Sequence, residues 1–345
     1  MELNCPLPIS DNDRILLGHG SGGRLTHRLI SDIFYPAFRN PLLEQDHDGS
    51  IFTVEGGKMA ISTDSFVVDP IFFPGGDIGD LAINGTVNDL ACCGAKPLYL
   101  TAGFILEEGF PMTDLQRIVN SMKEAADKAG IYIVSGDTKV VEHGKCDKIY
   151  INTTGIGIVD SNTNISPKNA AEGDVIICSA PIGVHGITIL STRESLGFET
   201  NLKSDTAALN KMIAGLCTGI NEIHVLRDPT RGGLSSTLNE IAQAANVEIE
   251  LDEASLPIPD AVRAASEILG LDPLYIANEG VVLIILPRKY AADALNIMHR
   301  FSEGKSAAVI GQVTTRGKAG VKMKNLYGGH RIITMLNGDQ LPRIC

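Results

Sequence analysis

Hydrophobic positions along this chain switch between the spacing of helices and that of strands. Apolar residues at every fourth position over 25–33 predict a helix directly after a glycine-rich stretch, 18–23. Next comes a hairpin pattern with Gly56-Gly57 at its turn. In this first half, strands are expected at 51–54, 58–63, 99–107, 131–134 and 148–159, and helices at 77–93 and 113–128. We expect Thr113 to cap the second of these helices and Gly130 to end it.

A polar stretch without periodicity, 160–174, is interpreted as a domain boundary. Beyond it, strands are expected at 175–179, 247–251, 281–286 and 307–313, and helices near 186–196, 205–224, 232–245 and 259–269. Mixed strands and helices on both sides predict an α/β fold. The predicted parts are an N-terminal arm with the glycine-rich loop and a helix (1–40), an N-terminal domain (41–160), a C-terminal α/β domain (170–326) and an irregular, mobile tail (327–345).

The composition narrows the class of protein. With 345 residues, 44% of them hydrophobic, the chain can bury a large core, and its net charge of −12 argues against a nucleic-acid partner. The longest strongly apolar run, 281–286, is far shorter than the roughly 20 residues of a membrane span. Seven cysteines scattered over a long chain do not indicate a disulfide framework, so a cytoplasmic location is expected. We interpret Cys92 and Cys93 as buried apolar residues and not as metal ligands.

Acidic residues recur beside glycines and at the ends of predicted strands. They are Asp46 and Asp48 before Gly49, Asp64, Asp89, Asp137 and Asp228. Side chains at the carboxyl ends of strands line the crevice in which layered α/β proteins bind ligands. Several carboxylates in one crevice repel each other, and repel phosphate, unless Mg²⁺ lies between them and a nucleotide. A single aspartate fits a turn or a helix cap equally well, and Asp228 can cap the helix that begins near Gly232.

A regular helix over 77–93 divides its own polar residues. At about 100° per residue, Asp80, Asn84 and Asn88 share one face, and Asp89 points about 100° away from Asn88. The two sets therefore cannot address the same phosphate. Either one set is structural, or the sets touch different parts of a ligand, and the sequence leaves this open.

Two further features carry candidate chemistry. The loop Gly20-Ser21-Gly22-Gly23 leads into a helix and can offer backbone N–H groups to a phosphate, although it matches neither common nucleotide-binding motif. Cys345 is the last residue of the sequence, and a thiolate there is a nucleophile. An extended tail beginning at residue 337 moves that sulfur over about 30 Å, which suits a carrier arm.

Together these motifs resemble those of one family. The chain is similar, nearly from end to end, to the HypE family of nickel–iron hydrogenase maturation factors. The resemblance rests on motifs at 20–23, 63–65, 73–77, 85–90, 136–139, 228–233, 277–280 and 342–345. The terminal Pro-Arg-Ile-Cys is specific to that family; the others are shared with aminoimidazole ribonucleotide synthetase, thiamin-phosphate kinase and selenophosphate synthetase. Ser21 and Arg24 stand where the selenophosphate enzymes carry a reactive Cys or selenocysteine and a Lys, which argues against selenium chemistry.

The resemblance implies a two-domain α/β fold like that of aminoimidazole ribonucleotide synthetase. It also implies a homodimer formed through the N-terminal domains, with ATP and Mg²⁺ in clefts that involve the dimer interface. Asp64, Asp89 and Asp228 match the family's metal and nucleotide ligands. The further nucleotide-binding candidates are Asp48, Asp137, Thr138, Gly22 and Gly23.

The implied activity is ATP-dependent dehydration of a carbamoyl group carried on Cys345. The carbamoyltransferase HypF would load the thiol, and the HypC–HypD complex would receive the product as an iron ligand. Phosphorylation of the carbamoyl oxygen makes its loss easier, because phosphate is a better leaving group than hydroxide. We expect Lys139 to neutralise charge during phosphoryl transfer and Glu279 to remove the N–H protons, although both also fit ordinary surface or strand-start roles.

Two alternatives remain at this point. An enzyme similar to aminoimidazole ribonucleotide synthetase would activate an amide on a free nucleotide and would not need a terminal cysteine. A nucleotide-gated scaffold would use ATP to move the tail, and its thiol would only dock a partner.

Overall fold

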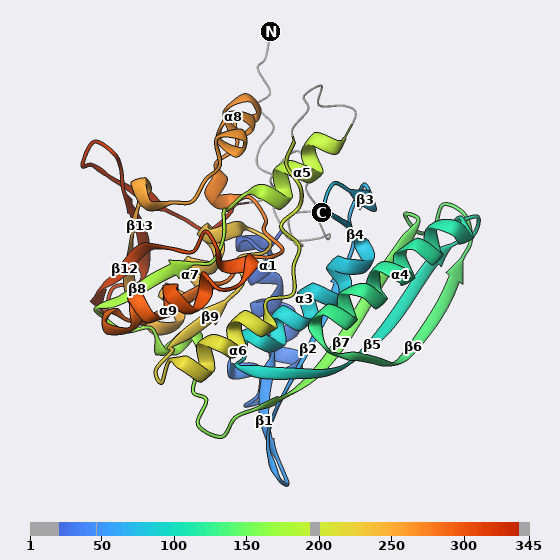
Figure 1. The fold of residues 1–345 in the computed structure, drawn as a ribbon, viewed down its shortest axis with the longest axis horizontal. Coiled ribbons are helices and arrows are strands. Elements are labelled where there is room, and N and C mark those ends of the chain that lie inside the picture. The colour runs from blue at the N-terminus through green and yellow to red at the C-terminus, as the bar shows by residue number, and fades with distance from the viewer. Residues whose placement is uncertain (1–20, 46, 194–200, 338–345) are drawn as a thin grey trace.

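Two β-sheets organise residues 21–45, 47–193 and 201–337, which this computed structural model describes (Figure 1). The first sheet has the strand order β1-β2-β7-β5-β6, and its neighbours are antiparallel except for the parallel pair β5 and β6. Its strands are β1 (Ser50–Val54), β2 (Gly57–Phe66), β5 (Ala95–Glu107), β6 (Tyr132–Val141) and β7 (Ile149–Val159). A short ribbon, β3 (Phe72–Phe73) with β4 (Gly76–Asp77), precedes the first long helix.

Helix α3 (Ile78–Cys92) packs on β2, β5 and β7, and α4 (Met112–Ala129) packs on α3. Asp77 caps α3 by accepting hydrogen bonds from the N–H groups of Gly79 and Asp80. Gly130 ends α4 in the left-handed region, as predicted. The expectation that Thr113 caps α4 is wrong: Pro111 holds the N-cap position, and its extended backbone lets the helix begin one residue before Thr113.

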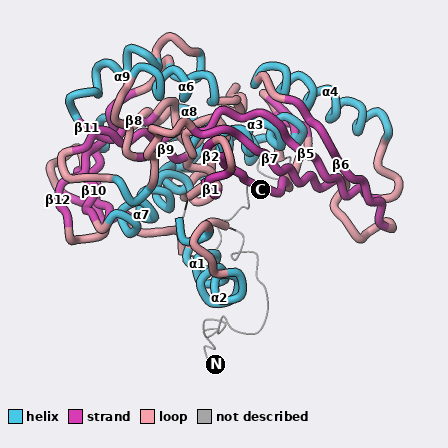
Figure 2. Tube along the Cα trace, turned by 90° about the horizontal axis from the view of Figure 1, so that it is seen from below, coloured by secondary structure: helices cyan, strands magenta, loops and turns pink. Residues whose placement is uncertain are grey.

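Among the residues that the structure describes, no helix covers the face of the first sheet opposite α3 (Figure 2). Side chains alternate along each strand, so residues paired across the sheet with Tyr99 share this open face. Tyr99 is 43% exposed and Ile158 on β7 is 52% exposed, whereas Ala60, Leu100 and the other α3-facing residues are buried. The two faces therefore have different surroundings, one a core and the other solvent.

The second sheet has the strand order β14-β13-β10-β12-β8-β11-β9. Its strands are β8 (Asp174–Cys178), β9 (Val225–Arg227), β10 (Val247–Asp252), β11 (Leu283–Pro287), β12 (Ala308–Arg316), β13 (Gly320–Lys324) and β14 (His330–Ile333). The helices of this half are α5 (Val184–Thr192), α6 (Asn210–Gly219), α7 (Gly233–Ala245), α8 (Asp260–Leu269) and α9 (Ala291–Met298). Helix α7 buries one face of the sheet, and α6 and α9 bury the other, because successive strand residues point to opposite sides.

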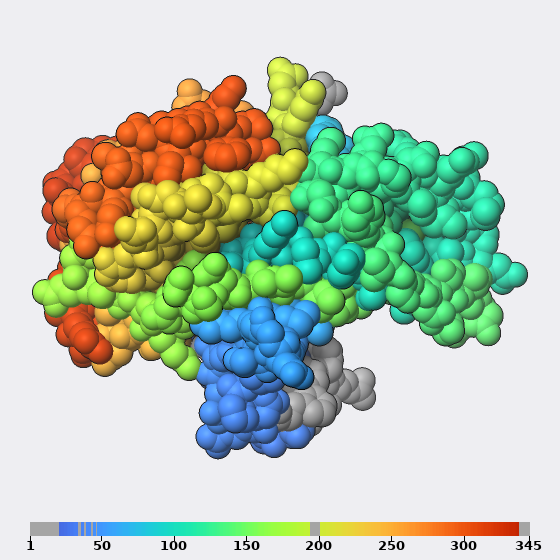
Figure 3. Space-filling view, turned by 60° about the horizontal axis from the view of Figure 1, so that its bottom comes forward, coloured from blue at the N-terminus to red at the C-terminus, as the bar shows by residue number. Residues whose placement is uncertain are grey.

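The N-terminal arm protrudes from the rest of the molecule (Figure 3). It contains α1 (Arg24–Leu29), a π-helical turn (Ile30–Phe34) and α2 (Tyr35–Phe38), so the predicted helix is present but interrupted. Short 3-10 turns lie at Leu43–Gln45, Pro167–Asn169, Glu253–Ser255, Pro273–Tyr275, Arg288–Tyr290 and Ser302–Gly304. None of the described helices is long and apolar enough to cross a membrane.

Most predicted elements are present. The differences concern short or edge strands, helix α9, which was not predicted, and helix α6, which begins at Asn210 and not near residue 205. The mixed α/β fold class is confirmed. Strand β6 runs to Val141 and not only to residue 134. The expectation of an irregular chain from Tyr327 onward is wrong for β14, which pairs with β13 at the edge of the second sheet. Because β14 has only four residues, its sequence pattern is too short to predict a strand or its pairing partner.

Candidate functional site

Four aspartates from separate segments converge beside α3. Asp48 precedes β1, Asp64 lies in β2, Asp89 lies in the last turns of α3, and Asp228 directly follows β9. Burial, followed by the charges of Asp228, Asp48 and Asp64, raises the pKa of Asp89 well above its usual value. The Ser62 hydroxyl donates a hydrogen bond to Asp89 Oδ2 at 2.6 Å. These four residues form what we call the aspartate cluster.

Two arginines offset part of this negative charge. Arg227 Nε lies 2.6 Å from Asp48 Oδ1, and Arg231 Nη2 lies 3.6 Å from Asp64 Oδ1. Burial raises the pKa of Asp64, and the charge of Arg231 opposes that shift. Four carboxylates facing two guanidinium groups leave an excess of negative charge. Carboxylate oxygens crowded in this way are the donor set of hard divalent cations such as Mg²⁺, so the residues present fit such an ion.

The polar face of α3 that carries Asp80, Asn84 and Asn88 makes different contacts from Asp89. The Asn88 amide donates to the carbonyl oxygen of Ala207 at 3.0 Å, and its oxygen accepts from the N–H of Leu209 at 2.8 Å. One turn earlier, Asn84 Nδ2 donates to Thr206 Oγ1 at 3.1 Å. Asp80 accepts from that same threonine hydroxyl. This face therefore holds residues 206–209 of the second half, whereas Asp89 faces the aspartate cluster.

Glu279 lies at the edge of the aspartate cluster. Burial, followed by the charges of Asp205, Asp64 and Asp228, raises the pKa of Glu279 well above its usual value. Asp205 Oδ1 accepts a hydrogen bond from the Glu279 N–H at 3.2 Å. The second oxygen of Asp205 is buried and has no hydrogen-bond partner within the described ranges. Burial raises the pKa of Asp205 to about 7.

The two glycines Gly22 and Gly23 bring distant backbone segments together. A Cβ on Gly22, whose φ is +71°, would lie 2.8 Å from the Arg231 carbonyl oxygen, and one on Gly23 would lie 2.3 Å from that of Leu336. The Gly22 N–H donates to Thr26 Oγ1 at 3.0 Å, so it is already engaged. In this structure, then, the loop allows close packing and does not offer the Gly22 N–H to a phosphate.

The comparisons with known proteins fit this arrangement. Family models of AIR synthase related proteins match the chain in two parts, the N-terminal domain over 46–159 and the C-terminal domain over 171–324. A carbamoyl dehydratase HypE from Azotobacter vinelandii is 50% identical over 334 residues, which cover 97% of this chain and 98% of that protein. The chain belongs to the HypE family of carbamoyl dehydratases.

Solved HypE structures have the same fold. A crystal structure of HypE in complex with ATP is 50% identical, has a TM-score of 0.81 and covers 96% of this chain and 100% of that one. HypE in a HypE–HypF complex is 47% identical, has a TM-score of 0.85 and covers 89% of this chain and 99% of that one. The resemblance to the HypE family and the fold related to aminoimidazole ribonucleotide synthetase are thereby confirmed.

Three candidate residues of this HypE-family chain lie away from the aspartate cluster. Asp137, Thr138 and Lys139 are on the exposed edge strand β6, and Lys139 Nζ pairs with Asp137 Oδ2 at 3.0 Å. Asp137 on β6 pairs with Gly103 on β5, and Gly103 pairs in turn with Asn152 on β7. Asn152 pairs with β2, so Asp137 lies three strands away from β2. It also points to the open face, opposite to Asp64. A single chain therefore does not bring these three residues to the cluster, and Cys345 lies outside the described residues.

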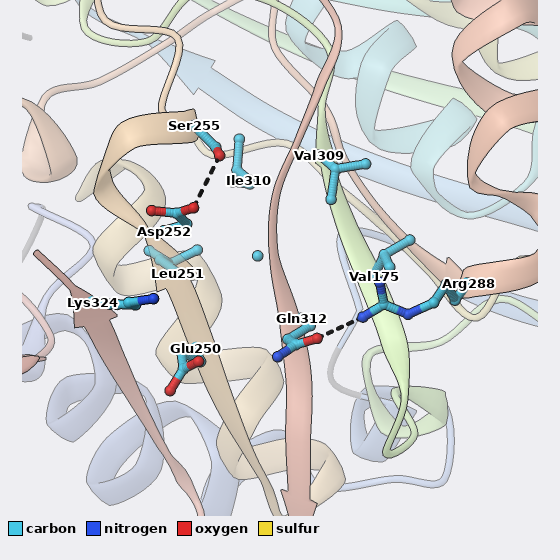
Figure 4. A pocket seen from close by; sticks show the side chains of 11 residues that line it. Val175, Glu250, Leu251, Asp252, Ser255, Arg288, Val309, Ile310, Gln312 and Lys324 are labelled. Atoms are coloured by element: carbon cyan, nitrogen blue, oxygen red, sulfur yellow. Dashed lines mark hydrogen bonds between the residues drawn. The ribbon is translucent and has the colours of Figure 1, made fainter. Parts of the chain in front are cut away.

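Several residues at the site were not predicted. Ser62, Arg227 and Asp205 gave no distinct signal, because their contacts depend on segments far apart in sequence. Arg231 belongs to a motif noted for Asp228, so its neighbourhood was visible. A separate pocket of about 280 Å³ lies on the second sheet, where Asp252, Lys324 and Gln312 line it (Figure 4). That pocket contains none of the candidate residues.

Proposed function

We propose that this chain catalyses the ATP-dependent dehydration of a carbamoyl group carried on Cys345. The thiocarbamate S–C(=O)–NH₂ becomes the thiocyanate S–C≡N, and the oxygen leaves as part of the phosphate released from ATP, with ADP as the other product. Membership in a family whose members are named carbamoyl dehydratases supports this activity. The observation that carries the proposal is the position from which the C-terminal tail departs, next to the aspartate cluster.

The segment after β14 is held at several points. The hydroxyls of Ser235 and Tyr275 donate to the Thr334 carbonyl oxygen at 2.6 and 2.9 Å. Leu336 then contacts Gly23, which adjoins Gly22 and, through it, Arg231 of the site. From there the eight residues 338–345 span up to about 26–29 Å when extended. This reach is ample for a thiol to enter a site whose edge lies beside the tail's origin.

The aspartate cluster would hold Mg²⁺ with ATP, through Asp64, Asp89 and Asp228, with Asp48 as a further oxygen donor. Mg²⁺, when bound, neutralises phosphate charge and so eases phosphoryl transfer. The solved HypE complex with ATP supports a nucleotide site in this family. Arg227 and Arg231 orient the carboxylates of Asp48 and Asp64.

Glu279 would act as the base that removes the carbamoyl N–H protons. Burial and the neighbouring carboxylates raise its pKa, and a carboxylate with a raised pKa is a stronger base once ionised. Asp205 fixes the backbone of Glu279 by accepting its N–H. Asp205 therefore positions the base and does not itself touch the substrate.

A second copy of the chain would cover the open face of the first sheet and form a homodimer. Exposed apolar side chains on β5, β6 and β7 support this, among them Tyr99, Tyr132 and Ile158. In such a dimer Lys139, Asp137 and Thr138 would lie in a cleft shared between subunits. HypF would load Cys345, and the solved HypE–HypF complex supports this partner. The reaction would take place in the cytoplasm. A HypC–HypD pair would then accept the product as an iron ligand during hydrogenase maturation.

Intact-mass measurement tests the proposal. After incubation with the carbamoyltransferase, carbamoyl phosphate and ATP, the chain should gain one carbamoyl group and then lose one water. Cys345→Ser should remain unmodified, whereas Cys217→Ser, which changes an exposed cysteine of α6, should react like the parent. An adduct that never dehydrates, or no adduct, supports the scaffold alternative. Full ATP-dependent turnover of a soluble amide by Cys345→Ser supports the free-nucleotide alternative.

A further inference from the structure

One thiol lies within the aspartate cluster. Cys92 ends α3, is fully buried and is a free cysteine. Its Sγ and one carboxylate oxygen each of Asp48 and Asp228 all lie within 4.8 Å of one another. Within residues 21–45, 47–193 and 201–337, the Cys92 thiol makes no hydrogen bond. A buried, unpartnered S–H beside carboxylates is therefore available as a ligand.

The chemistry of these three donors distinguishes between cations. Zn²⁺ and Cd²⁺ bind thiolate sulfur together with carboxylate oxygen, whereas Mg²⁺ takes oxygen ligands and keeps several waters. Without a cation, the surrounding carboxylates oppose ionisation of the thiol. A dication at this position reverses that electrostatic effect and favours the thiolate.

We propose that Asp48, Cys92 and Asp228 form a site for a thiophilic divalent cation of the Zn²⁺ and Cd²⁺ class. Because Asp48 and Asp228 are shared, a cation held there excludes Mg²⁺ from the aspartate cluster and blocks the activity. The blocking consequence rests on the function proposed above, whereas the binding site rests only on the donor set. Cys92 thus differs from the inert apolar residue that its sequence context predicts.

Cys93 supplies a matched control. It is equally buried and adjacent in sequence, but its Sγ lies 3.6 Å from His47 Nδ1 and it is not one of the three clustered donors. The experiment uses the full chain with the remaining cysteines other than buried Cys178 changed to serine, which are Cys5, Cys146, Cys217 and Cys345. This removes competing thiols from the measurement.

The metal-free protein is titrated with Cd²⁺, and the ultraviolet charge-transfer absorption of the cadmium–thiolate bond is recorded with the bound stoichiometry. The parent and Cys93→Ser should bind one Cd²⁺ per chain with this absorption. Cys92→Ser should lose the absorption and bind Cd²⁺ at least about tenfold more weakly. Rising Mg²⁺-ATP should displace Cd²⁺ from the parent.

Unchanged absorption and affinity in Cys92→Ser, or their loss in Cys93→Ser, would overturn the proposal. Cys92→Ala, which places no polar atom in the core, carries the same expectation should the serine variant not fold. Binding of Mg²⁺-ADP without Cd²⁺ is measured in every variant. Its absence throughout, with Cd²⁺ binding that still depends on Cys92, removes the proposed function but leaves the thiophilic site standing. The reverse result removes the thiophilic site alone.

Discussion

The backbone N–H of Arg24 donates a hydrogen bond to the carbonyl oxygen of Leu336 at 3.0 Å. The contact joins the start of α1 to the chain that follows β14, although more than 300 residues separate them in sequence. Gly22 on one side of this junction touches Arg231, whose guanidinium faces Asp64. The origin of the C-terminal tail and the edge of the aspartate cluster are therefore held in one packed unit.

Gly23→Ala should disturb this junction. The new Cβ would lie 2.3 Å from the Leu336 carbonyl oxygen, so one backbone segment must move. We expect the free energy of unfolding to fall by about 1–3 kcal/mol. The rate of carbamoyl dehydration, followed by time-resolved intact mass, should fall more than the rate of loading. Gly320→Ala, where a Cβ meets open space, is the control, and equal dehydration rates in both variants would contradict the prediction.

Asp89→Asn should separate stability from nucleotide binding. The substitution removes one of several crowded carboxylates, so without divalent ions at pH 8 the variant should be more stable to urea by about 1–2 kcal/mol. Its affinity for Mg²⁺-ATP in calorimetry should fall at least about tenfold. Asp80→Asn is the matched control, because burial and Asp77 raise the pKa of Asp80 to about 7 but its side chain lies on the other polar face of α3. Loss of nucleotide binding in both variants would refute the division between these faces.

Asn88→Ala should weaken the fold and leave the aspartate cluster intact. It removes hydrogen bonds to Ala207, Leu209 and Glu279 and leaves buried backbone groups without partners. Each such loss costs about 1–3 kcal/mol, and the two short bonds, to Ala207 and Leu209, dominate, so we expect the free energy of unfolding to drop by about 2–6 kcal/mol in total. Asn84→Ala, which breaks one bond to Thr206, should cost less. Urea denaturation measures both, and equal effects would argue against this contact set.

Asp205 should make stability depend on pH. Its pKa is near 3.8 when unfolded and about 7 when folded, because burial disfavours the charged carboxylate. A raised pKa gives a contribution to stability that is complete below pH 3.8 and is lost as the pH rises through 7. Asp205→Asn keeps the acceptor for the Glu279 N–H but cannot ionise. Its stability relative to the parent should therefore rise between pH 4 and pH 8, by up to about 4 kcal/mol. Parallel urea-denaturation curves across that range would contradict the assignment.

Tyr132→Asp should weaken the proposed dimer. Tyr132 lies on β6 and is 73% exposed in the single chain, and a charge placed in an apolar interface opposes association. Sedimentation should show at least about tenfold weaker self-association. Ile268→Asp, at a residue of α8 that is 72% exposed, should leave association unchanged. A parent chain that stays monomeric at all concentrations would remove the dimer and the shared cleft with Lys139.

Local signals explain which parts of the fold were predictable from sequence. Asp77 before α3, Gly130 after α4 and Gly56 in the turn between β1 and β2 act within a few residues, so their effects can be read directly. The turn itself is Glu55-Gly56, one residue earlier than predicted, because Gly57 already belongs to β2. Strand β9 has only three residues and exists because β11 pairs with it, which no local pattern encodes.

The candidate site was predictable to the extent that motifs marked it. Asp64, Asp89 and Asp228 each stand in a recognisable motif, and helix geometry alone separated Asp89 from Asn88. Asp205 stands at the start of a predicted helix, but α6 begins only at Asn210, and the contact of Asp205 with Glu279 joins residues 74 positions apart. Lys139 also stands in a recognisable motif, but it lies on the exposed edge strand β6. A single sequence does not reveal whether a second chain packs there.

Residues 206–209 complete the polar side of α3 although they belong to the other half of the chain. If the gene were divided between the two sheets, the first fragment would contain Asn84 and Asn88 without their hydrogen-bond acceptors. The second fragment would contain residues 206–209 without the helix on which they pack. We therefore expect the two fragments to be folded and soluble only when they are expressed together. Likewise, a chimera that takes its second half from a relative should fold only when the segment equivalent to 206–209 is complementary to the polar face of α3.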